Sequence, residues 1–187
     1  MTKLDLTHLD IPVLGIAAWS GTGKTTLLEA ILPRLRERGL RVAVIKHAHH
    51  EFDVDTPGKD SHRLRQAGAV PMLVASKRRF ALMMETPELD EADLSQLIEQ
   101  VKPLSPDMML IEGFKAWNMP KLELFRRNVD KPLRAFEDKW IRAIATTDDV
   151  ELPHGVERLD LDNHDAIIDW MMAWPSRWAM MRQGPRE

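Results

Sequence analysis

The sequence predicts a doubly wound α/β fold with a mostly parallel sheet, and three observations support this class. Short apolar runs typical of buried strands recur along the chain. Helical patterns alternate with them, as in sheets covered on both faces. No internal repeat, low-complexity tract or linker interrupts the 187 residues, a length that suits one domain. We therefore expect a single domain over 1–187, with a loosely ordered N-terminus at 1–11 and a C-terminal tail at 175–187.

The first half of the chain predicts a βαβ unit. Residues 12–18 are an apolar run bounded by turn-type residues, which indicates a strand. From 23 to about 38, Leu and Ile recur at helical spacing and a glycine follows, although Pro33 is expected to kink or weaken this helix. Residues 41–46 predict a second buried strand, paired in parallel with the first through a right-handed crossover.

The remaining elements continue the alternation. After a polar loop over 47–60, we expect a short helix near 59–67 and a β-hairpin from strands at 70–75 and 77–85. The other predicted elements are a helix at 90–101, strands at 108–111, 121–125 and 140–145, and a helix at about 164–174, with Pro175 ending that helix and starting another.

The composition excludes several classes of protein. The net charge is −3, with acids and bases interspersed, which argues against a general binder of nucleic acid or membrane surfaces. The chain has no cysteine, so it has no disulfide, thiolate nucleophile or cysteine-bearing metal site. Residues 1–11 lack the apolar core of a secretory signal, and no apolar run is long enough to span a bilayer. A cytoplasmic protein is the expectation.

Residues 18–25, Ala-Trp-Ser-Gly-Thr-Gly-Lys-Thr, predict a phosphate-binding loop (P-loop) between a strand and a helix. Gly21 and Gly23 lack a Cβ atom, so backbone N–H groups can approach phosphate oxygens closely. Lys24 would supply positive charge to the β- and γ-phosphates, and the Thr25 hydroxyl would ligate Mg²⁺. Ala18 stands where the strict pattern has Gly, which is tolerable at negative φ. The loop predicts binding of a nucleoside triphosphate within a P-loop NTPase-type fold.

A histidine- and aspartate-rich segment follows the strand at 41–46. Ligands of an open parallel sheet bind beyond the carboxyl ends of its strands, where this segment is expected. His47 and His49, in a cluster with His50, could form a transition-metal site with Asp53, or the segment could contact nucleotide or a partner, or be a plain polar loop. Mg²⁺ prefers oxygen ligands, so Asp53 and Asp55 are better magnesium candidates than the histidines.

Two further acids end predicted strands. Glu112 follows the strand at 108–111, where P-loop enzymes hold Mg²⁺ through water or orient the attacking water; the alternative is a surface acid that starts a turn. Asp148 follows the strand at 140–145 and could accept hydrogen bonds from N1–H and the N2 amine of guanine, or belong to an Asp-rich turn.

Three tryptophans recur every four residues near the C-terminus: Trp170, Trp174 and Trp178. This stripe predicts core or dimer contacts, or else a docking surface.

The P-loop AAWSGTGKTTLL, the stretch IKHAHHEFDVDTPGKDSHRLRQAGA at 45–69 and LIEGFK at 110–115 resemble the molybdopterin-guanine dinucleotide biosynthesis adapter proteins of the MobB family. The resemblance extends over about 12–172. It implies a GTP-binding, homodimeric adapter with weak GTPase activity, a hairpin extension that helps dimerisation, and a guanylyltransferase partner that joins GMP to molybdopterin. It also implies a phosphate site from Ser20, Gly21, Thr22, Gly23, Lys24, Thr25 and Thr26, with Asp55, Lys59 and Glu112 in shared motifs nearby. With GTP and Mg²⁺ as ligands, Lys24 and Glu112 are the expected catalytic residues, and Thr25, Asp55 and Glu112 the expected metal ligands.

Two other functions stay open from the residues. A small-molecule kinase would use Lys24 and Mg²⁺ similarly, with lid arginines from Arg63, Arg65, Arg78 or Arg79. A GTPase that delivers a metal ion is suggested by the histidine cluster.

Overall fold

The computed structural model of the protein describes residues 9–48, 52–87, 89, 91–115 and 117–183. The chain divides into a larger unit, Met1–His47 with Leu94–Glu187, and a smaller unit, Ala48–Asp93. One domain over 1–187 stays a prediction.

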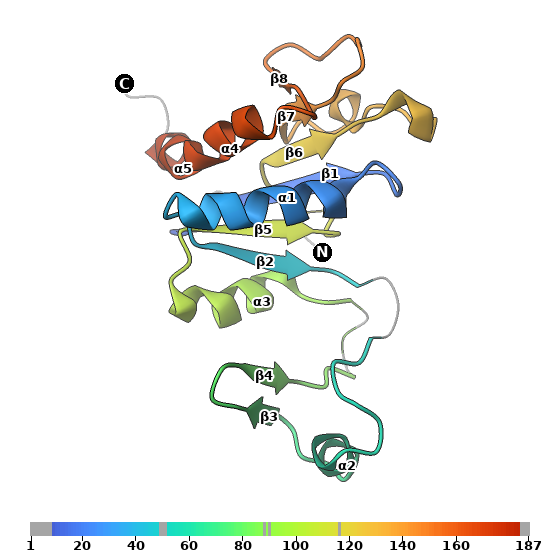
Figure 1. Ribbon diagram of the computed structural model, residues 1–187, viewed down its shortest axis with the longest axis vertical. Helices are drawn as coiled ribbons and strands as arrows, with labels where there is room; N and C mark the ends of the chain where they lie inside the picture. The colour runs from blue at the N-terminus through green and yellow to red at the C-terminus, as the bar shows by residue number, and fades with distance from the viewer. Residues whose placement is uncertain (1–8, 49–51, 88, 90, 116, 184–187) are drawn as a thin grey trace. The chain divides into compact units, whose positions relative to one another are not determined.

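The larger unit is built around a six-stranded sheet in which every pairing is parallel, and this confirms the predicted α/β class (Figure 1). The strand order is β2-β5-β1-β6-β7-β8. The strands are β1 (Val13–Ala18), β2 (Val42–Lys46), β5 (Met108–Glu112), β6 (Lys121–Leu124), β7 (Ile141–Ala145) and β8 (Glu157–Leu159).

The strand order corrects one sequence-based prediction. β1 and β2 do not pair with each other, because β5 lies between them and pairs with both. All four apolar residues of β5 are at most 1% exposed, so this strand is covered on both faces and takes a central place. β8 was not predicted, because the sequence Glu-Arg-Leu is too short and too polar to read as a buried strand.

Four of the five α-helices found among the described residues belong to the larger unit: α1 (Lys24–Glu37), α3 (Leu94–Val101), α4 (His164–Met172) and α5 (Trp174–Gln183). α1 is continuous through Pro33. α3 begins later than the predicted residue 90 and turns Leu94 and Ile98 into the core. Short 3-10 helices lie at Lys102–Leu104, Arg127–Val129 and Arg134–Phe136, so the crossover from β6 to β7 contains no described α-helix.

Helix α5 contacts the first residues that the structure describes at the N-terminal side. Up to residue 183 the predicted C-terminal tail is this helix, with Pro175 in its first turn, where a missing N–H costs nothing. Trp178 is buried and its Nε1 donates to the carbonyl of Leu9, 3.1 Å away. Ile11 is buried too, whereas residues 1–8 of the predicted loose N-terminus lie outside the described residues.

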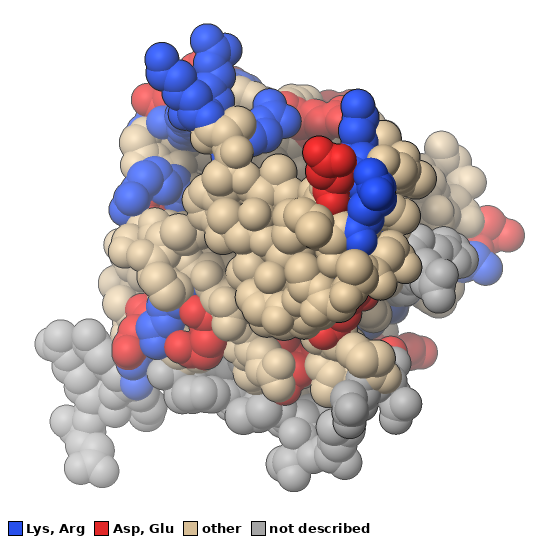
Figure 2. Space-filling view, turned by 90° about the horizontal axis from the view of Figure 1, so that it is seen from below, with Lys and Arg blue, Asp and Glu red and all other residues tan. Residues whose placement is uncertain are grey.

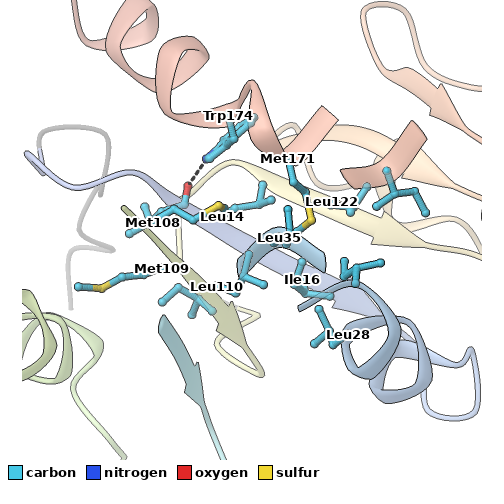
Figure 3. Packing of buried hydrophobic residues seen from close by; sticks show 14 of the residues in the cluster. Leu14, Ile16, Leu28, Leu35, Met108, Met109, Leu110, Leu122, Met171 and Trp174 are labelled. Carbon is cyan, nitrogen blue, oxygen red and sulfur yellow. Dashed lines mark hydrogen bonds between the residues drawn. The ribbon is translucent and has the colours of Figure 1, made fainter. Parts of the chain in front are cut away.

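The core lies between the sheet and the helices (Figure 3). Leu35 of α1 and Met171 of α4 are fully buried beside strand residues such as Leu14 and Leu122. Trp174 is 1% exposed and its Nε1 donates to the carbonyl of Val13 at 3.0 Å, so the tryptophan stripe is core, as one of the two interpretations of the sequence expected.

The smaller unit contains α2 (Asp60–Gln66) and an antiparallel hairpin of β3 (Met72–Ala75) and β4 (Phe80–Met83), which confirms the predicted hairpin. None of the residues described between 52 and 93 is buried. This unit therefore has no core of its own within one chain.

Candidate functional site

The predicted phosphate loop lies between β1 and α1, at the carboxyl end of the central strand. Gly21 and Gly23 have φ angles of 85° and 96°, a left-handed conformation that side chains rarely adopt. Gly23 immediately precedes α1, so the first N–H groups of the helix and its dipole face the loop. Ser20, Thr25 and Thr26 are exposed at this helix start. The arrangement is suited to binding an anion.

The conformation of the loop is stabilised by a hydrogen bond within it and by contacts with the crossover between β6 and β7. Thr22 is buried, and its hydroxyl donates to the carbonyl of Trp19 at 2.8 Å, which closes the turn. The Trp19 indole donates from Nε1 to the carbonyl of Pro132 at 2.9 Å, and the guanidinium carbon of Arg134 lies 3.7 Å from its ring centroid. The crossover between β6 and β7 thus supports the loop, a role that the sequence did not reveal.

Glu112 lies beside the loop and faces two lysines. Its Oε1 atom is 3.0 Å from Nζ of Lys24 and 3.6 Å from Nζ of Lys46. The strand register explains why Glu112 lies close to both lysines. Glu112 pairs with Ile16 of β1 on one side and with Lys46 of β2 on the other. The Glu112 side chain is only 13% exposed. Lys46 begins the polar segment that was expected at this edge of the sheet, but its contact with Glu112 was not predicted.

The turn after Glu112 requires glycine. Gly113 has a φ of 93°, and a Cβ atom there would lie 2.8 Å from Cβ of His47 and 3.1 Å from its carbonyl oxygen. His47 donates its backbone N–H to the carbonyl of Glu112 at 2.8 Å and stacks on Phe114. The ends of β2 and β5 are therefore tightly packed, and this packing positions the acid.

Asp148 follows β7 and already has a structural contact. Its Oδ2 accepts the backbone N–H of Arg127 at 2.7 Å, and its own N–H donates to the Thr146 hydroxyl at 3.0 Å. A carboxylate oxygen can accept more than one hydrogen bond, so recognition of guanine by Asp148 stays a prediction.

The smaller unit holds Asp53, Asp55 and Lys59. The pKa of Asp53 lies below its ordinary value because the backbone N–H of Asp55 and the Arg65 guanidinium bind its carboxylate. Arg65 also pairs with Glu85, and together these acids raise its pKa. Asp55 accepts from the Ser61 hydroxyl at 2.7 Å, and its Oδ2 is buried without a hydrogen bond among the described residues. This oxygen lies 4.0 Å from Nε of Arg65, so the guanidinium is its ion-pair partner. Lys59 precedes α2 and is exposed.

The predicted histidine cluster is described only in part. His47 stacks on Phe114, whereas His49 and His50 lie outside the described residues. Within the described part of the chain, no group of three or more His, Asp or Glu side chains is arranged to hold a metal ion. In the same part, no helix is long and apolar enough to cross a membrane.

Comparison with known proteins shows which family the chain resembles. The family model "Molybdopterin guanine dinucleotide synthesis protein B" (MobB) matches residues 13–147. The chain is 45% identical over 165 residues to the molybdopterin-guanine dinucleotide biosynthesis adapter protein of Escherichia coli (strain K12), covering 88% of this chain and 93% of that protein. It is 41% identical over 172 residues to the protein so named from Haemophilus influenzae, covering 92% and 94%. A crystal structure of molybdopterin-guanine biosynthesis protein B has a TM-score of 0.67 at 26% identity, covering 86% of this chain and 98% of the other.

Proposed function

Because the chain belongs to the MobB family and is an adapter of molybdopterin guanine dinucleotide biosynthesis, we propose that it performs this role by binding GTP with Mg²⁺ and hydrolysing it slowly. It would assist a separate guanylyltransferase, by presenting nucleotide or molybdopterin to it. Its expected compartment is the cytoplasm, where it would draw on the cell's GTP.

The observation that carries the proposal is the meeting of Lys24 and Glu112 at the phosphate loop, 3.0 Å apart. Lys24 would move to the β- and γ-phosphates when a triphosphate occupies the loop. Glu112 would then hold Mg²⁺ through water, or orient the attacking water, while the Thr25 hydroxyl ligates the metal. Asp55 would add a metal ligand, and Lys59 and Asp148 would contact the nucleotide.

Slow hydrolysis follows from what surrounds the acid. After Glu112 the chain reads Gly113-Phe114-Lys115, with no Gln to orient water as in faster GTPases and no obvious arginine finger in the sequence. An adapter that retains its nucleotide while a partner enzyme acts would need such a slow rate.

A homodimer is the second part of the proposal, and the smaller unit supports it. Large apolar side chains of the hairpin are exposed in the single chain, among them Leu73 at 55%, Phe80 at 63% and Leu82 at 47%. Figure 2 shows a broad surface without charged side chains, bordered by both basic and acidic residues. A two-stranded hairpin without a core is marginally stable alone, and a second copy of the chain would cover this surface.

The experiment for nucleotide binding is titration of GTP and of ATP, each with and without Mg²⁺. We expect tighter binding of GTP with Mg²⁺, no detectable triphosphate binding by Lys24→Ala, and wild-type behaviour of Lys102→Ala, which removes a lysine from the 3-10 helix after α3. Clearly tighter ATP binding would favour a kinase instead, and unchanged affinity of Lys24→Ala would overturn the assignment of the loop.

Two further measurements test the partners. Light scattering should give twice the mass of one chain, and Phe80→Lys with Leu82→Lys should reduce it to that of a monomer. Association with a guanylyltransferase, measured by co-purification, should depend on the folded adapter. A stable monomeric wild type contradicts the dimer, and repeated failure to associate contradicts the adapter mechanism.

A further inference from the structure

A cavity of about 420 Å³ lies beside the phosphate loop in the larger unit. Three indoles contribute to its lining: Trp19 from the loop itself, Trp117 before β6 and Trp140 before β7. This volume falls within the range of small-molecule sites, and indole faces are favourable surfaces for stacking planar rings. The lining therefore suits a flat aromatic ligand better than an aliphatic one.

The charges around the cavity favour an anion. Four cationic side chains line it: Lys115, Lys121, Arg134 and Lys139. The lining acids are Glu137 and Asp138, but Asp138 is already neutralised by Lys121, whose Nζ lies 2.7 Å from Oδ2. Three cations then face one acid. Lys115 and Lys139 are exposed, so they can reach an anionic group at the cavity mouth.

The walls of the cavity are built from buried polar contacts. Glu123 is fully buried and accepts the backbone N–H groups of Arg134 at 2.8 Å and Ala135 at 3.0 Å, which sets the turn that carries the Arg134 guanidinium. Burial raises the pKa of Glu123, although the two N–H groups oppose the rise. Lys121 passes over Gly15, where a Cβ atom would lie 2.8 Å from its Cγ. These buried contacts fix the backbone that carries Arg134 and the position of Lys121, both of which line the cavity.

We propose that this cavity is a second ligand site, for a planar heteroaromatic ring that carries an anionic group. The ring would stack on the indoles, and its anionic group would lie between Lys115 and Lys139. Because Trp19 belongs to both the cavity and the phosphate loop, binding at one site would change the ligand affinity of the other. Ring chemistry of this kind could come from a separate molecule, such as a pterin, or from the base of a nucleotide bound at the loop; the proposal commits to a separate molecule.

The test is calorimetric titration of the full chain with pterin-6-carboxylate and with uncharged pterin. We expect the carboxylate to bind more tightly than pterin. The double variant Lys115→Ala/Lys139→Ala should weaken pterin-6-carboxylate binding roughly tenfold through lost charge-assisted contacts. Trp140→Leu should weaken both probes through lost stacking. The matched control Arg36→Ala/Lys102→Ala removes two positive charges outside the cavity and should bind like wild type.

Each result decides the proposal. Binding that survives in Lys24→Ala and in the presence of saturating GTP supports a separate site. Loss of probe binding in Lys24→Ala, or displacement by GTP, overturns it and assigns the ring position to the nucleotide base. No binding by the wild type, or equal binding by cavity and control variants, overturns it as well. The titrations of the probe alone contain no triphosphate, so a failure of the probe to bind leaves the GTP titrations of the proposed function unaffected.

Discussion

Lys24 and Glu112 form an ion pair with 3.0 Å between Nζ and Oε1, which joins the first residue of α1 to the last residue of β5. The pair exists because β5 lies next to β1 in the sheet, with Glu112 paired to Ile16 close to the end of β1. The mobile Lys24 cation and the Glu112 carboxylate therefore lie where phosphate groups and a metal ion would bind.

Glu112→Gln keeps the size of the side chain but removes the negative charge that faces Lys24 and Lys46. We expect the gain in GTP affinity on adding Mg²⁺ to fall roughly 10- to 100-fold, since a group that holds the metal's shell is lost. Binding without Mg²⁺ should be unchanged or tighter, because the lysines lose a competing acid. Titrations with Mg²⁺ and with EDTA measure both. The control is Glu99→Gln, because Glu99 is an acid of α3 that pairs with Lys102 of the following 3-10 helix. An equal loss of the Mg²⁺-dependent gain in GTP affinity in both variants contradicts the role of Glu112.

Gly113→Ala should destabilise the fold more than Gly155→Ala. Both glycines have positive φ, 93° and 80°, but only at Gly113 does an added Cβ meet atoms within 4 Å, those of His47. We expect a loss of about 2–4 kcal/mol at Gly113, from backbone strain plus overpacking, against about 1 kcal/mol at Gly155 from strain alone. Urea unfolding measures both. Equal losses of stability in the two variants would show that the backbone around His47 and Gly113 shifts to accept the added Cβ atom at little cost.

Trp174→Phe should cost more stability than Trp170→Phe. Both indoles are buried and stack on each other, but Nε1 of Trp174 donates to the Val13 carbonyl, whereas Nε1 of Trp170 has no hydrogen-bond partner among the described residues. Loss of the bond leaves a buried carbonyl of β1 unpaired, at a cost of about 1–3 kcal/mol beyond the change in volume that both variants share. Thermal unfolding of the two variants compares them, and a larger loss for Trp170→Phe would contradict this reading.

Asp107→Asn should destabilise the protein at neutral pH but not in acid. The pKa of Asp107 lies below its ordinary value of 3.8 because the backbone N–H and then the guanidinium of Arg41 bind its carboxylate. A lowered folded-state pKa adds stability above the unfolded value, and this stability is lost as pH falls through the folded value. We expect a difference of about 0.5–1 kcal/mol at pH 7, small because the side chains are exposed.

The measurement for Asp107 is the free energy of unfolding of wild type and variant from pH 7 downward. The difference should begin to shrink near pH 4 and approach zero well below it. A difference that stays constant over this range would show that the ionised carboxylate contributes nothing beyond its shape.

Part of the site could be read from local sequence. The glycine spacing at Gly21 and Gly23 and the lysine after them require neighbours only a few residues apart, so the loop and the start of α1 were predictable. The hairpin at β3 and β4 has the same local origin. In contrast, the stacking of Arg134 on Trp19 joins segments far apart in the chain, and no local pattern indicates it.

The sequence by itself determined the α/β class, the phosphate loop and the family, because strand runs, helical periods and motif spacing are properties of short segments. Only the tertiary structure decided that β5 separates β1 from β2, that Lys46 joins Lys24 around Glu112, and that the crossover to β7 encloses a cavity beside the loop. The physical reason is that strand order and side-chain burial depend on which distant surfaces pack together, and a strand as apolar as β5 can enter a sheet at any interior position.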